Sequence, residues 1–297
     1  MGNFLYFLMC GAARLMQLFP LRFHYLVSDI FYFLMCYVVR YRKKVIIQNL
    51  RNSFPEKSDA EILKITKKYY THLCDVFIET FYLAYIPEKE MRKRVVVLNP
   101  EEISQYHKAG RSTVAVLGHY ANWEWMTATP LYIEYPRFHY FYKRLKSEAW
   151  DRFMLRLRSR MGATLTEKDN VFRLLIGEKQ KGNLNCSGFL ADQAPKANMV
   201  QYWTTFLNQD TAMFLGAEKV ALKTNSPVVF GHMNKIKRGY YEVELTTIIK
   251  EPSECKKYEI TEAYTRILEE KIKQRPELWM WSHKRWKYKK ETTSKTK

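Results

Sequence analysis

A histidine directly after a buried strand is the residue best placed to do chemistry in this sequence. Residues 113–118 (TVAVLG) are apolar and rich in β-branched side chains, which predicts a buried strand, and His119 follows them at once. Glu124 comes five residues later, in the first turn of the next expected helix. A carboxylate placed there could hold one imidazole nitrogen and leave the other free to take a proton from a hydroxyl. The pattern therefore predicts a histidine general base that is oriented by an acid.

Spacing alone does not select this pair. With 7 histidines and 30 acidic residues in 297 positions, chance gives roughly 0.7 matches to His-x-x-x-x-Asp/Glu, so such a match stays a hypothesis. A second match, His24–Asp29, lies inside the apolar N-terminal segment, where no strand precedes it. We interpret that second match as a chance pair or as a polar contact between N-terminal helices. The strand before His119 is what favours the first match.

The elements that must position His119 alternate between strand and helix. Ser58, with Glu61 three residues later, predicts the capped start of a long helix over 58–85. Beyond it, strands are expected at 113–118, 138–142, 162–165, 185–191, 227–233 and 240–247, and helices at 122–131, 149–160, 171–179, 212–223 and 260–273. This order predicts an α/β fold with an open, mixed, partly parallel sheet flanked by helices. Ligands of such sheets gather at the carboxyl ends of the strands, where His119 is expected.

The N-terminal segment has the composition of a membrane anchor. Residues 1–13 and 30–39 are uncharged and apolar, but neither run reaches the roughly 18 residues of a spanning helix. No basic residue precedes the first run, which argues against a cleaved secretory signal. Four of the six Lys and Arg residues among the first 50 cluster at 40–44, and such a cluster is retained on the cytoplasmic side and attracts anionic headgroups. We expect two helices that dip into or lie on the inner leaflet, at the cytoplasmic face of the inner (plasma) membrane; two buried core helices are the alternative.

Length and composition suggest the organisation of the whole chain. The 297 residues fit one large α/β domain, or two small ones, and a hydrophobic content of 47% is enough for a sizeable core. We divide the chain into N-terminal anchor helices (1–44), an α/β domain (45–287) and a basic, disordered tail (288–297).

The net charge of +19 calls for an anionic partner. Nucleic acid, anionic lipid and an acidic protein would all satisfy it, but the sequence holds no nucleic-acid-binding signature, so we expect no nucleic acid. The five cysteines are scattered and form no C-x-x-C pair. Neither a disulfide framework nor a zinc site is indicated, and no metal is expected.

Short blocks in a fixed order along nearly the whole chain resemble one protein family. They are NLRNSFP at 49–55, GHYANWE at 118–124, YKRLK at 142–146, RSRMG at 158–162, ADQ at 191–193 and PELWMWSHKRWK at 276–287. The series resembles the acyltransferases of late lipid A synthesis, within the lysophospholipid acyltransferase superfamily. The resemblance implies a glycerolipid-acyltransferase-like fold.

The resemblance also implies roles for seven polar residues. His119 and Glu124 would be the catalytic pair, and Asn122 would hold the His119 turn or the developing oxyanion. The residues expected to bind substrate are Lys143 and Arg158, which would face the donor thioester or the acceptor's phosphates, and Asp192 and Gln193, which would lie at a neighbouring strand end.

The implied reaction moves a fatty acyl chain from a thioester to a lipid hydroxyl without an acyl-enzyme. The resemblance implies acyl carrier protein as donor, with acyl-CoA as the alternative, and a lipid A-type glycolipid as acceptor. No cofactor beyond the acyl-thioester co-substrate is expected, and the absence of G-x-S-x-G disfavours a serine hydrolase. Another lipid acceptor (an amine lipid, a glycolipid or a polyene-type lipid) stays open, as does a non-catalytic, basic membrane-bound scaffold. The sequence leaves the acyl chain length and the acceptor position undetermined.

Overall fold

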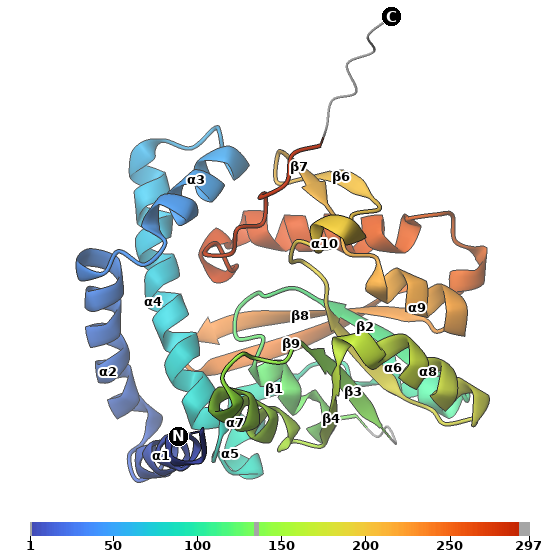
Figure 1. The fold of residues 1–297 in the computed structure, drawn as a ribbon, viewed down its shortest axis with the longest axis horizontal. Helices are drawn as coiled ribbons and strands as arrows, with labels where there is room; N and C mark the ends of the chain where they lie inside the picture. The colour runs from blue at the N-terminus through green and yellow to red at the C-terminus, as the bar shows by residue number, and fades with distance from the viewer. Residues whose placement is uncertain (1, 134–136, 291–297) are drawn as a thin grey trace, which may run out of the picture.

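A seven-stranded mixed sheet runs through the part of the chain that the computed structural model describes, residues 2–133 and 137–290 (Figure 1). Its strand order is β1-β9-β8-β2-β5-β3-β4. Every pair of neighbours is parallel except the β8–β9 hairpin. The strands are β1 (Val95–Val97), β2 (Thr113–Leu117), β3 (Phe138–Tyr142), β4 (Ala163–Glu167), β5 (Cys186–Leu190), β8 (Val228–Lys237) and β9 (Tyr240–Ile249). The predicted mixed, partly parallel α/β fold is thereby confirmed.

Helices cover the sheet, and the N-terminal helices lie beside it at one edge of the molecule (Figure 1). The α-helices are α1 (Gly2–Met16), α2 (Leu21–Phe33), α3 (Lys43–Ser53), α4 (Asp59–Leu83), α5 (Glu88–Arg94), α6 (Glu101–Lys108), α7 (Glu148–Ser159), α8 (Val171–Gln180), α9 (Gly216–Thr224) and α10 (Glu259–Gln274). A small separate hairpin joins β6 (Trp203–Phe206) to β7 (Gln209–Ala212). In Figure 1 the blue N-terminal helices stand beside α4 at one edge of the molecule, while α10 and α9 lie on the opposite side of the sheet from α7 and α5.

The long helix α4 begins where the sequence predicts. Ser58 accepts a hydrogen bond from the Glu61 backbone, and the Glu61 side chain accepts one from the Ser58 backbone, which completes a capping box. The predicted domain boundary at residue 44 falls in the first turn of α3. The predicted tail at 288–297 lies outside the described residues from 291 onward.

The segment after His119 differs from the expected α-helix. Residues Trp125–Leu131 form a 3-10 helix, η2, that contains Pro130. Proline has no backbone N–H to continue an α-helix. The hydroxyls of Thr127 and Thr129 each donate to a backbone carbonyl three residues earlier, at 2.7 Å, which satisfies acceptors that an α-helix would have used.

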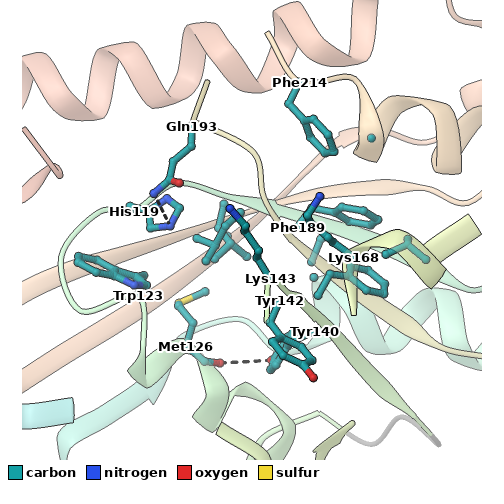
Figure 2. A pocket seen from close by; sticks show the side chains of 18 of the residues that line it. His119, Trp123, Met126, Tyr140, Tyr142, Lys143, Lys168, Phe189, Gln193 and Phe214 are labelled. Atoms are coloured by element: carbon teal, nitrogen blue, oxygen red, sulfur yellow. Dashed lines mark hydrogen bonds between the residues drawn. The ribbon is translucent and has the colours of Figure 1, made fainter. Parts of the chain in front are cut away.

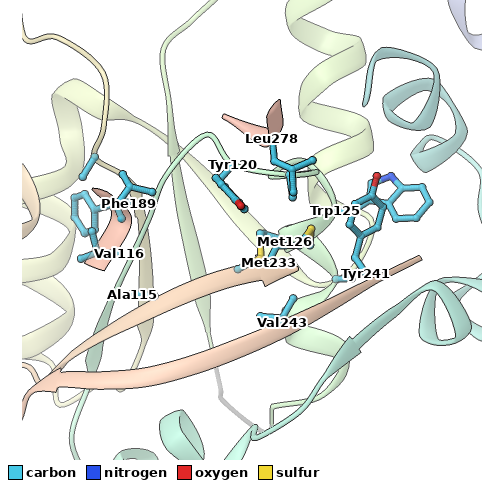
Figure 3. Packing of buried hydrophobic residues seen from close by; sticks show 14 of the residues in the cluster. Ala115, Val116, Tyr120, Trp125, Met126, Phe189, Met233, Tyr241, Val243 and Leu278 are labelled. Carbon is cyan, nitrogen blue, oxygen red and sulfur yellow. The ribbon is translucent and has the colours of Figure 1, made fainter. Parts of the chain in front are cut away.

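A hydrophobic core lies directly beneath the carboxyl end of β2. Val116 is fully buried, as expected for the centre of a parallel sheet that is covered on both faces. Figure 3 shows the Trp125 and Tyr241 rings side by side, and their centroids are 5.6 Å apart. The turn after His119 is thus continuous with the core, which limits its freedom to move.

Candidate active site

Two neighbouring parallel strands bring His119 and Asp192 together. Leu117 of β2 pairs with Leu190 of β5, and each polar residue lies two positions beyond its leucine. The Nδ1 atom of His119 is 2.5 Å from Oδ1 of Asp192, and the His119 backbone N–H donates to Oδ2 at 2.8 Å. The indole of Trp279 also donates to Oδ2, at 2.8 Å. Strand register and these three donors therefore fix the carboxylate against the imidazole.

Burial, charge and hydrogen bonds all act on the pKa of Asp192. Burial alone would raise the pKa of Asp192, but the charge and hydrogen bonds of His119 and the bond from Trp279 lower it to about 2. Because Asp192 is ionised at neutral pH, Nδ1 of His119 must carry the proton, and Nε2 is the acceptor. The Gln193 amide nitrogen lies 3.1 Å from Nε2 and donates to it, as Figure 2 shows. In this tautomer the lone pair of Nε2 can accept a proton from a hydroxyl that displaces the amide.

Gly118 permits this close approach. A Cβ atom at this position would lie 2.8 Å from Cδ1 of Leu268 and 3.4 Å from Oδ2 of Asp192. A larger residue would require the end of the Leu268 side chain to shift. The glycine thus lets α10 and the Asp192 carboxylate pack closely against the end of β2.

Glu124 does not hold His119, contrary to the sequence-based prediction. Both of its carboxylate oxygens accept hydrogen bonds from Arg158, at 2.8 and 2.6 Å. Burial would lower the pKa of Arg158, but the bonds and charge of Glu124 raise it. Asp192 takes the position beside the imidazole because the end of β5 adjoins the end of β2, while Glu124 lies past a turn and meets α7. All the same, His119, Glu124 and Arg158 line one cavity.

Asn122 holds the turn after His119. Its amide nitrogen donates to Glu79 Oε2 at 2.6 Å, and its amide oxygen accepts from the Trp125 backbone at 3.2 Å. The side chain is fully buried and is not among the described residues that line the cavity. Of the two expected roles, the geometry fits the one in the turn and not the one at the oxyanion.

The second sequence match, His24–Asp29, lies on α2 and does not form a pair either. The His24 ring packs against Tyr82 with centroids 5.7 Å apart. Asp29 forms an ion pair with Arg238 at 2.6 Å. Neither His24 nor Asp29 lines the cavity beside His119 within the described part of the chain.

The cavity beside His119 has a volume of about 680 Å³, within the usual range of small-molecule sites. Its buried apolar floor comes from strands of the sheet and from neighbouring helices. We define this floor as Ile103, Ala115, Met126, Phe138, Val171, Cys186, Phe189 and Leu245. Gly188 keeps the floor open, since a Cβ there would lie 2.6 Å from the Tyr140 ring.

Cations surround the opening of this cavity. We define the basic rim as its four lysines, Lys143, Lys168, Lys196 and Lys287, which are exposed or half-exposed. Figure 2 shows Lys143 and Lys168 across the cavity from His119. Lys143 and Arg158, which the sequence analysis expects to face substrate, thus line one cavity, and this cavity combines an apolar floor with a cationic rim.

Sequence reasoning missed His283, which lines the same cavity. Burial lowers its pKa to about 4, so the ring is neutral at physiological pH. Its Nε2 accepts from the Ala194 backbone at 3.5 Å. Two sequence signals could have indicated His283. It lies within the aromatic and basic block at 276–287, and its partner Ala194 follows the strand that ends at residue 190. Across residues 2–133 and 137–290, no cluster of three or more His, Cys, Asp or Glu side chains could hold a metal ion.

A mixed α/β sheet thus presents a histidine at its strand ends, beside a cavity with an apolar interior. The chain belongs to the bacterial lipid A biosynthesis acyltransferase family, whose model matches residues 1–288. It is accordingly an acyltransferase. No curated protein matches the sequence. Among solved structures, it is similar to the 1-acyl-sn-glycerophosphate acyltransferase PlsC from Thermotoga maritima, with 11% identity and a TM-score of 0.40 over 87% of this chain and 99% of that chain.

Proposed function

We propose that the protein transfers a fatty acyl chain from the thioester of an acyl carrier protein to a hydroxyl of a lipid A-type glycolipid. The observation that carries this proposal is the single cavity that His119 shares with the apolar floor and the basic rim. The floor suits an acyl chain, because it removes apolar surface from water. The rim suits the phosphates of a glycolipid and the acidic surface of a carrier protein.

In the proposed mechanism, His119 acts as general base and no acyl-enzyme forms. The acceptor hydroxyl displaces the Gln193 amide from Nε2 and gives its proton to that nitrogen as its oxygen attacks the thioester carbonyl. Asp192 stays ionised, keeps the ring in the required tautomer and stabilises the imidazolium. The C–S bond then breaks, and the imidazolium returns the proton to the departing thiolate. Proton transfer of this kind contributes about 10²–10⁴ in rate.

The oxyanion of the tetrahedral intermediate needs a donor. We assign this role to the displaced Gln193 amide, because its nitrogen lies beside Nε2 in the resting site and Asn122 is bound to Glu79. One such donor is worth about 10²–10³ in rate. In this proposal, the Glu124–Arg158 pair fixes a guanidinium in the cavity wall, where it faces the thioester or a phosphate of the acceptor.

We further propose that the N-terminal helices seat the protein on the cytoplasmic face of the inner membrane. Most of the exposed large apolar side chains of the described residues lie in α1, α2 and the segments that follow them, including Phe4, Leu18, Leu26, Ile30 and Val38. Exposed apolar surface of this extent marks a contact with lipid or protein. No single described helix is long and apolar enough to cross a membrane; the pair Leu21–Val38 and Lys43–Ser53, bent by 85°, meets that test only together.

The test is a reconstituted reaction with defined substrates. Purified protein, acyl-carrier-protein thioesters of several chain lengths and a lipid A-type acceptor should give an acceptor that is heavier by one acyl group, together with free carrier thiol. Acyl-CoA replaces the carrier thioester in a second arm, and an amine lipid, another glycolipid and a polyene-type lipid replace the acceptor in others. Transfer only to one of these would keep the enzyme class and change the acceptor. Absence of transfer in every arm would overturn the proposal.

A further inference from the structure

The helix α4 carries a stripe of three buried ionisable side chains that do not line the cavity. His72, Asp75 and Glu79 are at most 4% exposed, and their spacing of three and four residues places them on one face of the helix. Buried polar groups are costly unless they are hydrogen-bonded. All three have partners here. The β8–β9 hairpin supplies Lys235, Arg238 and Tyr241, and two further sets of partners come from other parts of the chain.

The first set of partners is the turn that carries His119. Asn122 donates to Glu79 Oε2 at 2.6 Å, and the Nε2–H of His72 donates to the Ala121 carbonyl at 3.1 Å. Ala121 has a φ of +47°, a left-handed conformation that costs a non-glycine residue about 1 kcal/mol or more. Such a conformation persists only where its surroundings hold it. The α4 stripe supplies that restraint from below the turn.

The second set of partners is α2. The Tyr25 hydroxyl donates to Glu79 Oε1 at 2.6 Å, and the Ser28 hydroxyl donates to Asp75 Oδ1 at 2.8 Å. The outward side of the same helix presents exposed apolar residues such as Leu26 and Ile30. The helix α2 therefore has two faces. One face is apolar and exposed, and the other completes a polar cluster that reaches the turn after His119.

Glu79 is the point where these two sets meet. Its carboxylate is fully buried and accepts from Tyr25, Asn122 and Tyr241, each at 2.6 Å. Burial raises its pKa and also raises the pKa of the Tyr25 hydroxyl. The loss of any one donor leaves a buried oxygen under-satisfied, and the carboxylate must then move toward its remaining partners.

We propose that Glu79 is a positioning residue for the reaction centre, and that α2 completes this centre by supplying the Tyr25 hydroxyl to it. Glu79 acts through Asn122, which fixes the turn between His119 and η2. The inference rests on the proposed function, since it assigns α2 a part in acyl transfer in addition to any part at the membrane. It follows that a defect in α2 lowers turnover even when no membrane is present.

The decisive variant is Tyr25→Phe, assayed with a detergent-solubilised acceptor so that membrane binding plays no part. We expect kcat to fall about tenfold, the effect of one unsatisfied buried acceptor, while KM for the donor stays within about twofold. Tyr32→Phe is the matched control: it removes from the same helix a hydroxyl whose partners are Tyr37 and Cys36, outside the α4 stripe. Thermal melting should show that both variants fold.

A polarity swap tests the Glu79–Asn122 contact directly. Glu79→Gln sets an amide against the Asn122 amide and should lower kcat more than Tyr25→Phe does. The double variant Glu79→Gln/Asn122→Asp restores a donor–acceptor pair and should recover part of that loss. A merely structural role would leave kcat of the folded single variants near the wild-type value.

A labelling experiment that does not need turnover separates this inference from the proposed function. Diethyl pyrocarbonate modification of His119, followed by peptide mass spectrometry, should be several-fold faster in Tyr25→Phe and Glu79→Gln than in wild type or Tyr32→Phe, because a loosened turn exposes the ring. If the wild type transfers no acyl group, the proposed function fails, and the labelling rates still decide whether Glu79 positions His119. Wild-type kcat and labelling rates in Tyr25→Phe and Glu79→Gln would overturn the inference.

Discussion

Two polar clusters in the described part of the chain differ in what faces them. The strand-end cluster (His119, Asp192 and Gln193) adjoins the cavity, and its outermost acceptor is covered only by a neutral amide. The α4 cluster consists of the stripe of His72, Asp75 and Glu79. These side chains are hydrogen-bonded to side chains of neighbouring elements and do not line the cavity.

The difference shows how one fold separates chemistry from support. A group that must exchange protons with a substrate needs a partner that can leave, and an amide that a hydroxyl can replace meets that need. A group that supports a turn needs partners that cannot leave, and buried tyrosine and asparagine side chains meet that need. Changes in the strand-end cluster should therefore affect mainly turnover, and changes in the α4 cluster should affect stability as well.

The largest expected effect is that of His119→Ala. The change removes the proposed base, so kcat/KM for acyl transfer should fall by about 10³ or more while the melting temperature changes little. Initial rates with a carrier-linked donor measure it. His24→Ala is the control from the second sequence match, and its activity should stay within a few-fold of wild type; equal losses at both positions would refute the assignment of His119.

Two carboxylate variants test whether Asp192 or Glu124 orients the imidazole of His119. Asp192→Asn should lower kcat by about 10³, because the required tautomer and the imidazolium lose their support. Glu124→Gln should cost only about tenfold, through a weakened hold on Arg158. Both changes keep the side-chain volume, so activity of folded protein can be compared directly. A larger loss for Glu124→Gln would show that Glu124, and not Asp192, acts on His119 during turnover.

The sequence was sufficient to predict the strands and the place of His119 at a strand end, but not the carboxylate that contacts it. Alternating hydrophobic segments predicted β2, β3 and β5 within about a residue. The contact between His119 and Asp192 depends on which strands are neighbours, and nothing local to either residue encodes that. The spacing of His119 and Glu124 suggested a pair, yet the carboxylate turned toward Arg158 on a helix thirty-four residues away.

Short elements were harder to predict for a related reason. The helices α5 and α6 and the strands β6 and β7 each have 8 residues or fewer. Such lengths are too short for a periodic hydrophobic pattern to be recognised. Their stability comes from tertiary contacts rather than from local preference. The positioning role of Glu79 was missed for the same reason, since its partners lie 43 and 54 positions away in sequence.

A stability comparison tests the division between the two clusters. Glu79→Ala removes the acceptor of three buried donors and should lower the free energy of unfolding by about 3 kcal/mol. His119→Ala should change it by less than about 1 kcal/mol, because the histidine already faces a cavity. Denaturant unfolding in a single detergent, followed by tryptophan fluorescence, measures both. Similar losses for the two variants would show that the strand-end cluster also supports the fold.

The smallest expected effect is that of salt, which should act differently on the exposed cations and on the buried ion pair. The basic rim is exposed or half-exposed, so its attraction for anions should weaken as the Debye length falls from about 10 Å at 0.1 M to about 3 Å at 1 M salt. The Glu124–Arg158 pair is largely buried and bidentate, so salt should screen it far less. We therefore expect kcat/KM to drop several-fold between these salt concentrations while kcat at saturation changes little.

Two lysine variants connect that salt dependence to the cavity. Lys143→Ala should flatten the dependence of kcat/KM on salt, and Lys143→Glu should flatten it further, because Lys143 belongs to the rim. Lys223→Ala removes the same charge from the exposed end of α9, away from the cavity lining, and should leave the slope unchanged. Initial rates at several salt concentrations with one donor and one acceptor give all the slopes. If kcat/KM does not depend on salt in the wild type, capture of the substrates does not depend on the rim, and the net charge of +19 serves another partner.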